Sequence, residues 1–323
     1  MRIHYLLDDS AARLPLAIRS SEGLWDRAAE LRSSPGVQLV ELTTQHMLGT
    51  GATLVDELAH YFDRGAPSDA DPYHLAECFA ERTAFEDLLR DVRETRPDLV
   101  ALHEVAELFP LDFTEDLHFT LALTVVGYPA FGYVRTYTDS EGESFYGLVV
   151  NLAQARPHIE GLIGRFSLEV LINTIRHGFF NHEGFRLAYS VYCAAIGRTP
   201  ERPLDRAREE LMSRGIAWYL SYRHDFAFYD QVLGLDTAAL TAHIEQCNAL
   251  LEGNNKKRSI ENLDELSSDS PALRCLDVAG YFAARAIANA HGEDALRQAI
   301  VKGPLHFIRL YNELKLPLPK ITL

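Results

Sequence analysis

The stretch FSLEVLINTIRHGFFN, residues 166–181, carries apolar side chains at the spacing of a helix. These positions are Leu168, Leu171, Ile172, Ile175 and Phe179. Because residues three and four apart share one face of an α-helix, the pattern predicts a helix with one buried face. Gly184 follows closely, and a glycine after the last periodic residue commonly ends a helix. The helix is therefore expected to end there.

Two polar residues of this helix, His177 and Asn181, stand four positions apart beside the apolar face. Neighbours at this spacing lie one above the other. In the sequence H-E-x-x-H, two histidines at this spacing bind zinc and the glutamate acts as a general base. Here the same frame has Gly178 in place of the base and Asn181 in place of the second histidine.

The residues that precede this helix are the richest in strand formers. Residues 118–137 and 145–152 contain many Val, Thr, Phe and Tyr side chains and are joined by a polar turn. Two such runs predict a hairpin or a small sheet, and they are the strand region that the sequence indicates. Helical periodicity prevails elsewhere, as in 203–225. The chain is therefore expected to be α+β and mostly helical, with a small antiparallel sheet packed on helix 166–181.

Composition limits the classes of function. The chain has 323 residues, 47% of them hydrophobic, which is enough for a large core. It has 31 Lys plus Arg against 46 Asp plus Glu, and a net charge of −15 argues against nucleic acid as a partner. The longest apolar runs are too short for a membrane helix, so no membrane partner is expected. Four scattered cysteines favour a reducing compartment, and we expect a cytoplasmic location.

The order of these elements resembles that of the gluzincin-type zinc metallopeptidases, and in particular their bacterial zinc-dependent peptidases. The resemblance lies in a small sheet, then a helix with the frame TI-x-H-x-FF-x, then a helix with x-G-I-A-x-Y-L, and it extends over residues 118–315. It implies an N-terminal helical region, 1–117, and a gluzincin-like region, 118–323, that form one compact unit.

The resemblance places His177 at the first zinc ligand, Gly178 at the catalytic glutamate and Asn181 at the second ligand histidine. Arg214, in SRGIAWYLS, takes the place of the third-ligand glutamate. Zinc needs three ligands from His, Cys or carboxylate, and a guanidinium cannot be deprotonated to become one. The expectation is therefore a protein without a catalytic residue, without a bound metal and without another cofactor.

An arginine in the place of a ligand suggests a different use for the same cleft. Arg214 is expected to project toward His177 and Asn181, with Glu210 one turn earlier as its partner. A guanidinium presents donors in a fixed fork that suits carboxylates. The expected function is a catalytically inactive, gluzincin-like protein that retains a cleft for a peptide or a small carboxylate.

Two alternatives remain open. The first is a zinc-dependent peptidase with other ligands, drawn from His177, His182, Glu183 or Glu210. Against it, residues 182–186 read HEGFR, in which arginine replaces the second histidine and a glycine weakens the helix. The second alternative is a helical interaction protein without an active site. A Ser-His-Asp triad also stays open, because its members need to be close only in space.

Overall fold

The computed structural model describes residues 1–96, 102–138, 144–252 and 271–323. The chain divides into two compact units, each assembled from separate segments. The sheet unit comprises Ile3–Val100 and Asp116–Arg176, and the helical unit comprises Met1–Arg2, Ala101–Glu115 and His177–Leu323. The expected boundary between residues 117 and 118 lies inside strand β2. No helix in the described ranges combines the length and apolarity needed to cross a membrane.

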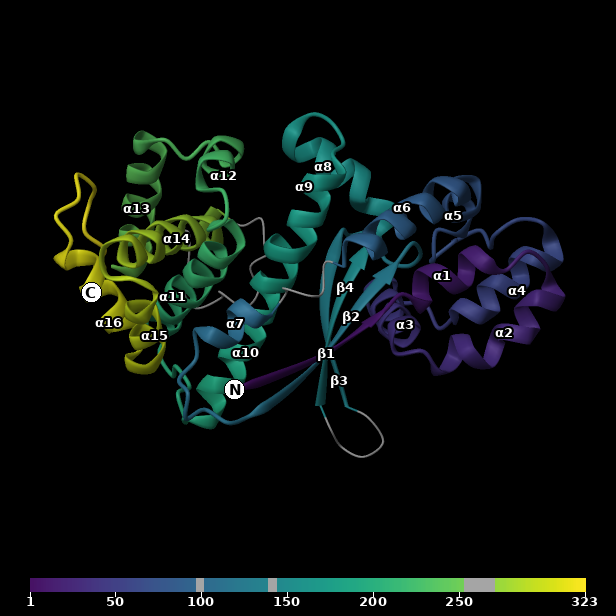
Figure 1. The fold of residues 1–323 in the computed structure, drawn as a ribbon, viewed down its shortest axis with the longest axis horizontal. Helices are drawn as coiled ribbons and strands as arrows, with labels where there is room; N and C mark the ends of the chain where they lie inside the picture. The colour runs from purple at the N-terminus through teal and green to yellow at the C-terminus, as the bar shows by residue number, and fades with distance from the viewer. Residues whose placement is uncertain (97–101, 139–143, 253–270) are drawn as a thin grey trace. The chain divides into compact units, whose positions relative to one another are not determined.

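The sheet unit contains the strands and the helices that surround them (Figure 1). Its strands are β1 (Arg2–Asp8), β2 (Asp116–Thr124), β3 (Gly132–Thr138) and β4 (Ser144–Asn151). Its helices are α1 (Ser10–Ala17), α2 (Ser21–Ser33), α3 (Pro35–Leu48), α4 (Leu54–Arg64), α5 (Leu75–Ala80), α6 (Arg82–Thr95), the 3₁₀ turn Leu152–Gln154, α8 (Ala155–Ile163) and α9 (Leu168–Asn173).

The sheet is mixed, with strand order β1-β2-β4-β3, so the expectation of an antiparallel sheet is wrong. β3 and β4 form the expected antiparallel hairpin, whose turn 139–143 lies outside the described residues. β2 pairs with β4 in parallel, with Phe119 opposite Tyr146 and Thr124 opposite Asn151. The chain therefore leaves β2, forms β3 at the edge of the sheet, and then returns as β4 between β2 and β3. Strand β1 was not expected, because RIHYLLD lacks a regular alternation of apolar and polar residues.

The central strands are buried on both faces. Leu121 to Leu123 in β2 and Leu148 to Val150 in β4 are all inaccessible to solvent, which suits strands covered from two sides. Helices α1 and α3 pack on the strands. Gly147 in β4 permits this approach, because a β-carbon there would collide with the side chain of Leu39 on α3.

The helical unit is built around two long helices, α11 and α14, which pack against each other along much of their length (Figure 1). Its helices are α7 (His103–Glu107), α10 (His182–Ala195), α11 (Pro203–Tyr222), α12 (Phe226–Leu233), α13 (Thr237–Leu251), α14 (Pro271–His291), α15 (Glu293–Lys302) and α16 (Pro304–Glu313). The mostly helical α+β class is therefore confirmed.

The segment 166–181 is helical, but it does not end at Gly184. After α9 the chain forms a π-helix, Thr174–Asn181, and continues directly into α10. The segment therefore starts in the sheet unit and continues in the helical unit. Gly184 is buried inside α10, where a β-carbon would collide with the side chain of Leu102. This close packing outweighs the weak helix propensity of glycine.

Candidate metal centre

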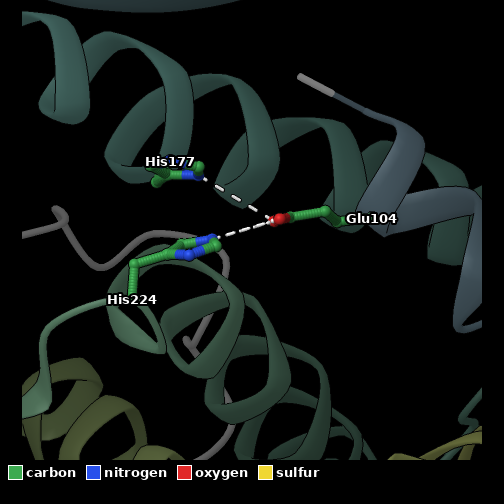
Figure 2. Close-up of side chains that lie close together, drawn as sticks. All are labelled: Glu104, His177 and His224. Carbon is green, nitrogen blue, oxygen red and sulfur yellow. Dashed lines mark hydrogen bonds and ion pairs between the residues drawn. The ribbon is translucent and has the colours of Figure 1, made fainter. Parts of the chain in front are cut away.

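Three side chains of the helical unit lie close together and could bind a metal ion: Glu104, His177 and His224 (Figure 2). Glu104 lies on α7, His177 lies in the π-helix, and His224 lies just after α11. One donor atom from each residue lies within 4.8 Å of the other two. Glu104 and His177 are buried, whereas the side chain of His224 is 44% exposed. The group is therefore open to solvent on the His224 side.

The Glu104 carboxylate lies beside the two imidazoles and faces a nitrogen of each (Figure 2). His224 Nε2 is 3.1 Å from Glu104 Oε1, and His177 Nδ1 is 3.9 Å from Glu104 Oε2. The two rings are close to each other, with centroids 3.9 Å apart and planes inclined by 35°. Each imidazole directs a nitrogen to the same carboxylate, so the three donors surround one small volume.

Asn181 fixes the position of Glu104. Its Nδ2 donates to Glu104 Oε2 at 2.7 Å, and its Oδ1 accepts a hydrogen bond from the Leu102 amide at 3.1 Å. Leu102 directly precedes α7 and has a left-handed φ of 67°, which is unfavourable for a branched side chain. Its side chain packs on Gly184. The amide and the glycine together hold α7, and with it Glu104, against the helix that carries His177.

The charge of Glu104 is balanced by Arg223, the residue before His224. Arg223 Nη2 is 3.0 Å from Glu104 Oε1. The other side of the guanidinium pairs with Glu293, which also accepts a hydrogen bond from the Tyr219 hydroxyl at 2.9 Å. Burial favours the neutral form of Glu104, but the hydrogen bond from His224 and the charge of Arg223 outweigh it and lower the pKa of Glu104 to about 2. Glu104 is therefore ionised at neutral pH, as a metal ligand must be.

The donor set and its spacing fit a zinc ion. Catalytic zinc sites use three protein ligands, commonly histidine and carboxylate, and leave one position open. With tetrahedral bonds of about 2.1 Å, the donors stand roughly 3.4 Å apart. The donors of Glu104, His177 and His224 lie within 4.8 Å of one another, so small movements of the side chains would bring them to that spacing. Arg223 opposes a cation at this place, because it holds a positive charge against one of the ligands.

The other candidate residues form a second group around Arg214. Arg214 forms a bidentate ion pair with Asp277, in which Nη2 lies 3.1 Å from Oδ2, and its Nη1 lies 3.8 Å from Glu210 Oε2. Arg214 and Asp277 are both buried. His182 belongs to the same group, because burial, Arg186 and Arg214 together lower the pKa of His182 to about 3. His182 is therefore neutral at neutral pH.

Glu183 and Ser221 complete this second group. Glu183 lies 3.8 Å from Arg186, and burial raises the pKa of Glu183 despite the nearby arginines. Ser221 Oγ lies 3.5 Å from His182 Nδ1, but the hydroxyl donates to the Ala217 carbonyl at 2.9 Å. Ser221 is 1% exposed, so this serine and histidine are closed to a substrate.

The residues expected to bind a ligand therefore make their contacts in two groups. His177 and Asn181 lie together, with Asn181 Nδ2 3.4 Å from His177 Nδ1. Arg214 forms an ion pair with Glu210, and its charge contributes to the lowered pKa of His182. The alternative ligands His177 and His182 also take part in different groups.

Comparison with known proteins gives one indication of function. Residues 198–315 match the model of a family described as "Putative zinc dependent peptidase (DUF5700)". The matched range includes Arg214, Arg223 and His224, whereas Glu104 and His177 precede it. Searches of curated proteins and of solved structures find no match. The match shows a likeness to zinc peptidases over the C-terminal helices.

The expectation that the chain binds no metal or cofactor is wrong on these findings. Sequence reasoning counted His177 as the one competent ligand of the motif, with Gly178 in the place of the base. The structure adds Glu104 and His224 to His177, and the matched family is described as zinc dependent. Both findings point to zinc.

Glu104 and His224 were missed because they lie outside the motif frame. Each lies at or near the end of a helix, and both belong to segments that are distant from His177 in the sequence. The sequence shows only a glutamate and a histidine at or near helix ends. Nothing in it indicates that the fold brings these helix ends to the helix that carries His177. Their convergence depends on tertiary packing.

Proposed function

We propose that the chain is a zinc-dependent peptidase that holds its metal through Glu104, His177 and His224. The observation that carries the proposal is the convergence of an ionised, buried carboxylate with two imidazoles, one of which is exposed to solvent. The likeness of residues 198–315 to zinc peptidases supports both the metal and the substrate class. Zinc in such a site polarises a carbonyl group and activates a water molecule.

The surrounding residues have separate roles in this proposal. Asn181 orients Glu104 through its hydrogen bond to Oε2. Arg223 lies beside the exposed His224 and presents donors for the carbonyl or carboxylate of a peptide. Glu293 is 40% exposed and is held by Tyr219 and Arg223, and we assign to it the role of proton acceptor.

A second candidate is a protein that binds zinc and a peptide carboxylate without hydrolysis. Gly178 supports it, because a glycine in the base position of the motif cannot accept a proton.

Zinc binding tests the centre. The chelated and dialysed protein is titrated with zinc, and the bound metal is measured by elemental analysis and calorimetry. We expect about one equivalent, and a loss of affinity of at least about tenfold in Glu104→Gln and in His224→Gln. Glu107→Gln and His103→Gln are matched controls, because both side chains are exposed on the same helix α7. Equal losses in the ligand variants and the controls, or no binding by the wild-type protein, would overturn the centre.

Peptide cleavage separates the two candidates. The zinc-loaded protein is incubated with a mixed peptide library, and the products are identified by mass spectrometry. Cleavage that disappears on chelation and in Glu104→Gln supports the peptidase. Zinc binding with intact peptides supports the non-hydrolytic candidate instead.

A further inference from the structure

Arg223 lies between two carboxylates of the helical unit. Its Nη2 is 3.0 Å from Glu104 Oε1, and its Nη1 pairs with Glu293 Oε1. Glu104 is buried, whereas Glu293 begins α15 and is partly exposed. The Tyr219 hydroxyl holds Glu293 in place. Two acceptors that differ in burial therefore share a single guanidinium.

A metal ion would change this balance. The guanidinium of Arg223 stays charged at any pH at which proteins are studied. A divalent cation bound by Glu104 would lie within a few ångströms of that charge, and like charges at such distances repel strongly in partly buried surroundings. Glu104 cannot remain a full partner of both cations. A position of Arg223 against Glu293 is compatible with the metal, because it moves the guanidinium toward solvent.

We propose that Arg223 is an exchangeable counter-ion of the metal centre. Arg223 neutralises Glu104 when no metal is bound, and Glu293 retains Arg223 when a cation binds Glu104. The Arg223–Glu293 pair therefore sets the affinity for zinc. This inference rests on the zinc centre proposed above. It assigns to Arg223 a weakening of zinc binding, whereas Asn181 favours zinc binding because it orients the ligand Glu104.

A double-mutant cycle tests the proposal in the full-length protein. Zinc dissociation constants are measured by competition with a chromophoric chelator for the wild type, Arg223→Gln, Glu293→Gln and the double variant. We expect Arg223→Gln to bind zinc about tenfold more tightly, because the competing charge is gone. Glu293→Gln should bind about tenfold more weakly, because Arg223 then has Glu104 as its remaining carboxylate. The double variant should behave like Arg223→Gln, since Glu293 acts through Arg223.

Two surface positions supply matched controls. Asp294 follows Glu293 in the first turn of α15 and pairs with Arg297, and Arg202 pairs with Asp205 at the start of α11. Asp294→Asn and Arg202→Gln remove the same charges at exposed positions. Both should leave the zinc affinity unchanged.

Thermal unfolding provides an independent readout. Without zinc, Arg223→Gln should melt below the wild type, because Glu104 keeps a buried charge without its main counter-ion. Zinc should then raise the melting temperature of Arg223→Gln more than that of the wild type. A purely structural role would lower the melting temperature without increasing the effect of zinc.

The possible results distinguish this inference from the proposed function. Weaker zinc binding in Arg223→Gln would mean that Arg223 supports Glu104, and would overturn the inference while leaving the zinc centre intact. A Glu293→Gln affinity equal to that of Asp294→Asn would also overturn it. No binding by any variant would overturn the proposed function, and this inference with it.

Discussion

Gly215 on α11 lies directly against Gly280 on α14. A β-carbon on either glycine would collide with the backbone of the opposite helix. The two glycines therefore let the helices approach more closely than side chains would permit. This contact joins the helix that carries Arg214 to the helix that carries Asp277, and α11 leads directly to His224.

Gly215→Ala should destabilise the protein by about 3 kcal/mol, because the added methyl group has to force the two backbones apart. Urea unfolding followed by circular dichroism measures the loss. Gly161→Ala on α8 is the control, since a β-carbon there meets no atom within 4 Å. That change should be neutral or stabilise by up to about 1 kcal/mol. Equal stability of the two variants would contradict the close helix contact.

Asp277→Asn should lower the free energy of unfolding by about 3–5 kcal/mol. Arg214 is buried against Asp277, and removal of one partner leaves an uncompensated buried charge. The double variant Arg214→Met/Asp277→Leu should regain much of the loss, because the charge is removed as well. Chemical denaturation measures all three proteins. A double variant less stable than Asp277→Asn would show that the ion pair is not the cause.

The stability of the protein should depend on His182 below about pH 6.5. The folded-state pKa of His182 is about 3, so between pH 6.5 and pH 3 the unfolded chain takes up a proton that the folded protein does not. Each unit of acidification therefore removes about 1.4 kcal/mol of stability through this residue.

His182→Gln removes this proton uptake from the unfolded state. Relative to the variant, the wild type should lose about 2 kcal/mol between pH 6.5 and pH 5. Urea midpoints at several pH values measure the difference. His103→Gln, at an exposed histidine, should follow the wild type. Parallel pH profiles for the wild type and His182→Gln would refute the prediction.

The helices could be predicted largely from sequence, because apolar periodicity records which face is buried. The predicted helix 203–225 is α11, Pro203–Tyr222. The pairing of β2 with β4 could not be read in this way, since the same residues suit parallel and antiparallel partners. Gly184 misled the prediction because its packing partner, Leu102, is distant in the sequence.

The candidate site was partly accessible from sequence. His177 and Asn181 share a helix, and their closeness follows from their spacing. Glu104 and His224 reach His177 through the packing of α7 and the end of α11, which no local pattern records. The orientation of the Arg214 side chain also depends on its ion pair with Asp277, a residue outside the zinc-peptidase motifs.

Asn181→Asp should make the protein more dependent on zinc. The substitution keeps the shape of the side chain and the acceptor for the Leu102 amide, but it places a second carboxylate where Asn181 Nδ2 now lies 2.7 Å from Glu104 Oε2. Two carboxylates this close repel each other, so the metal-free variant should melt at a lower temperature than the wild type. A zinc ion relieves the repulsion, and the increase in melting temperature with zinc should exceed that of the wild type. Asn289→Asp, at an exposed position of α14, is the control and should respond to zinc as the wild type does. If Asn181→Asp gains no more stability from zinc than Asn289→Asp, the cation does not bind beside Glu104.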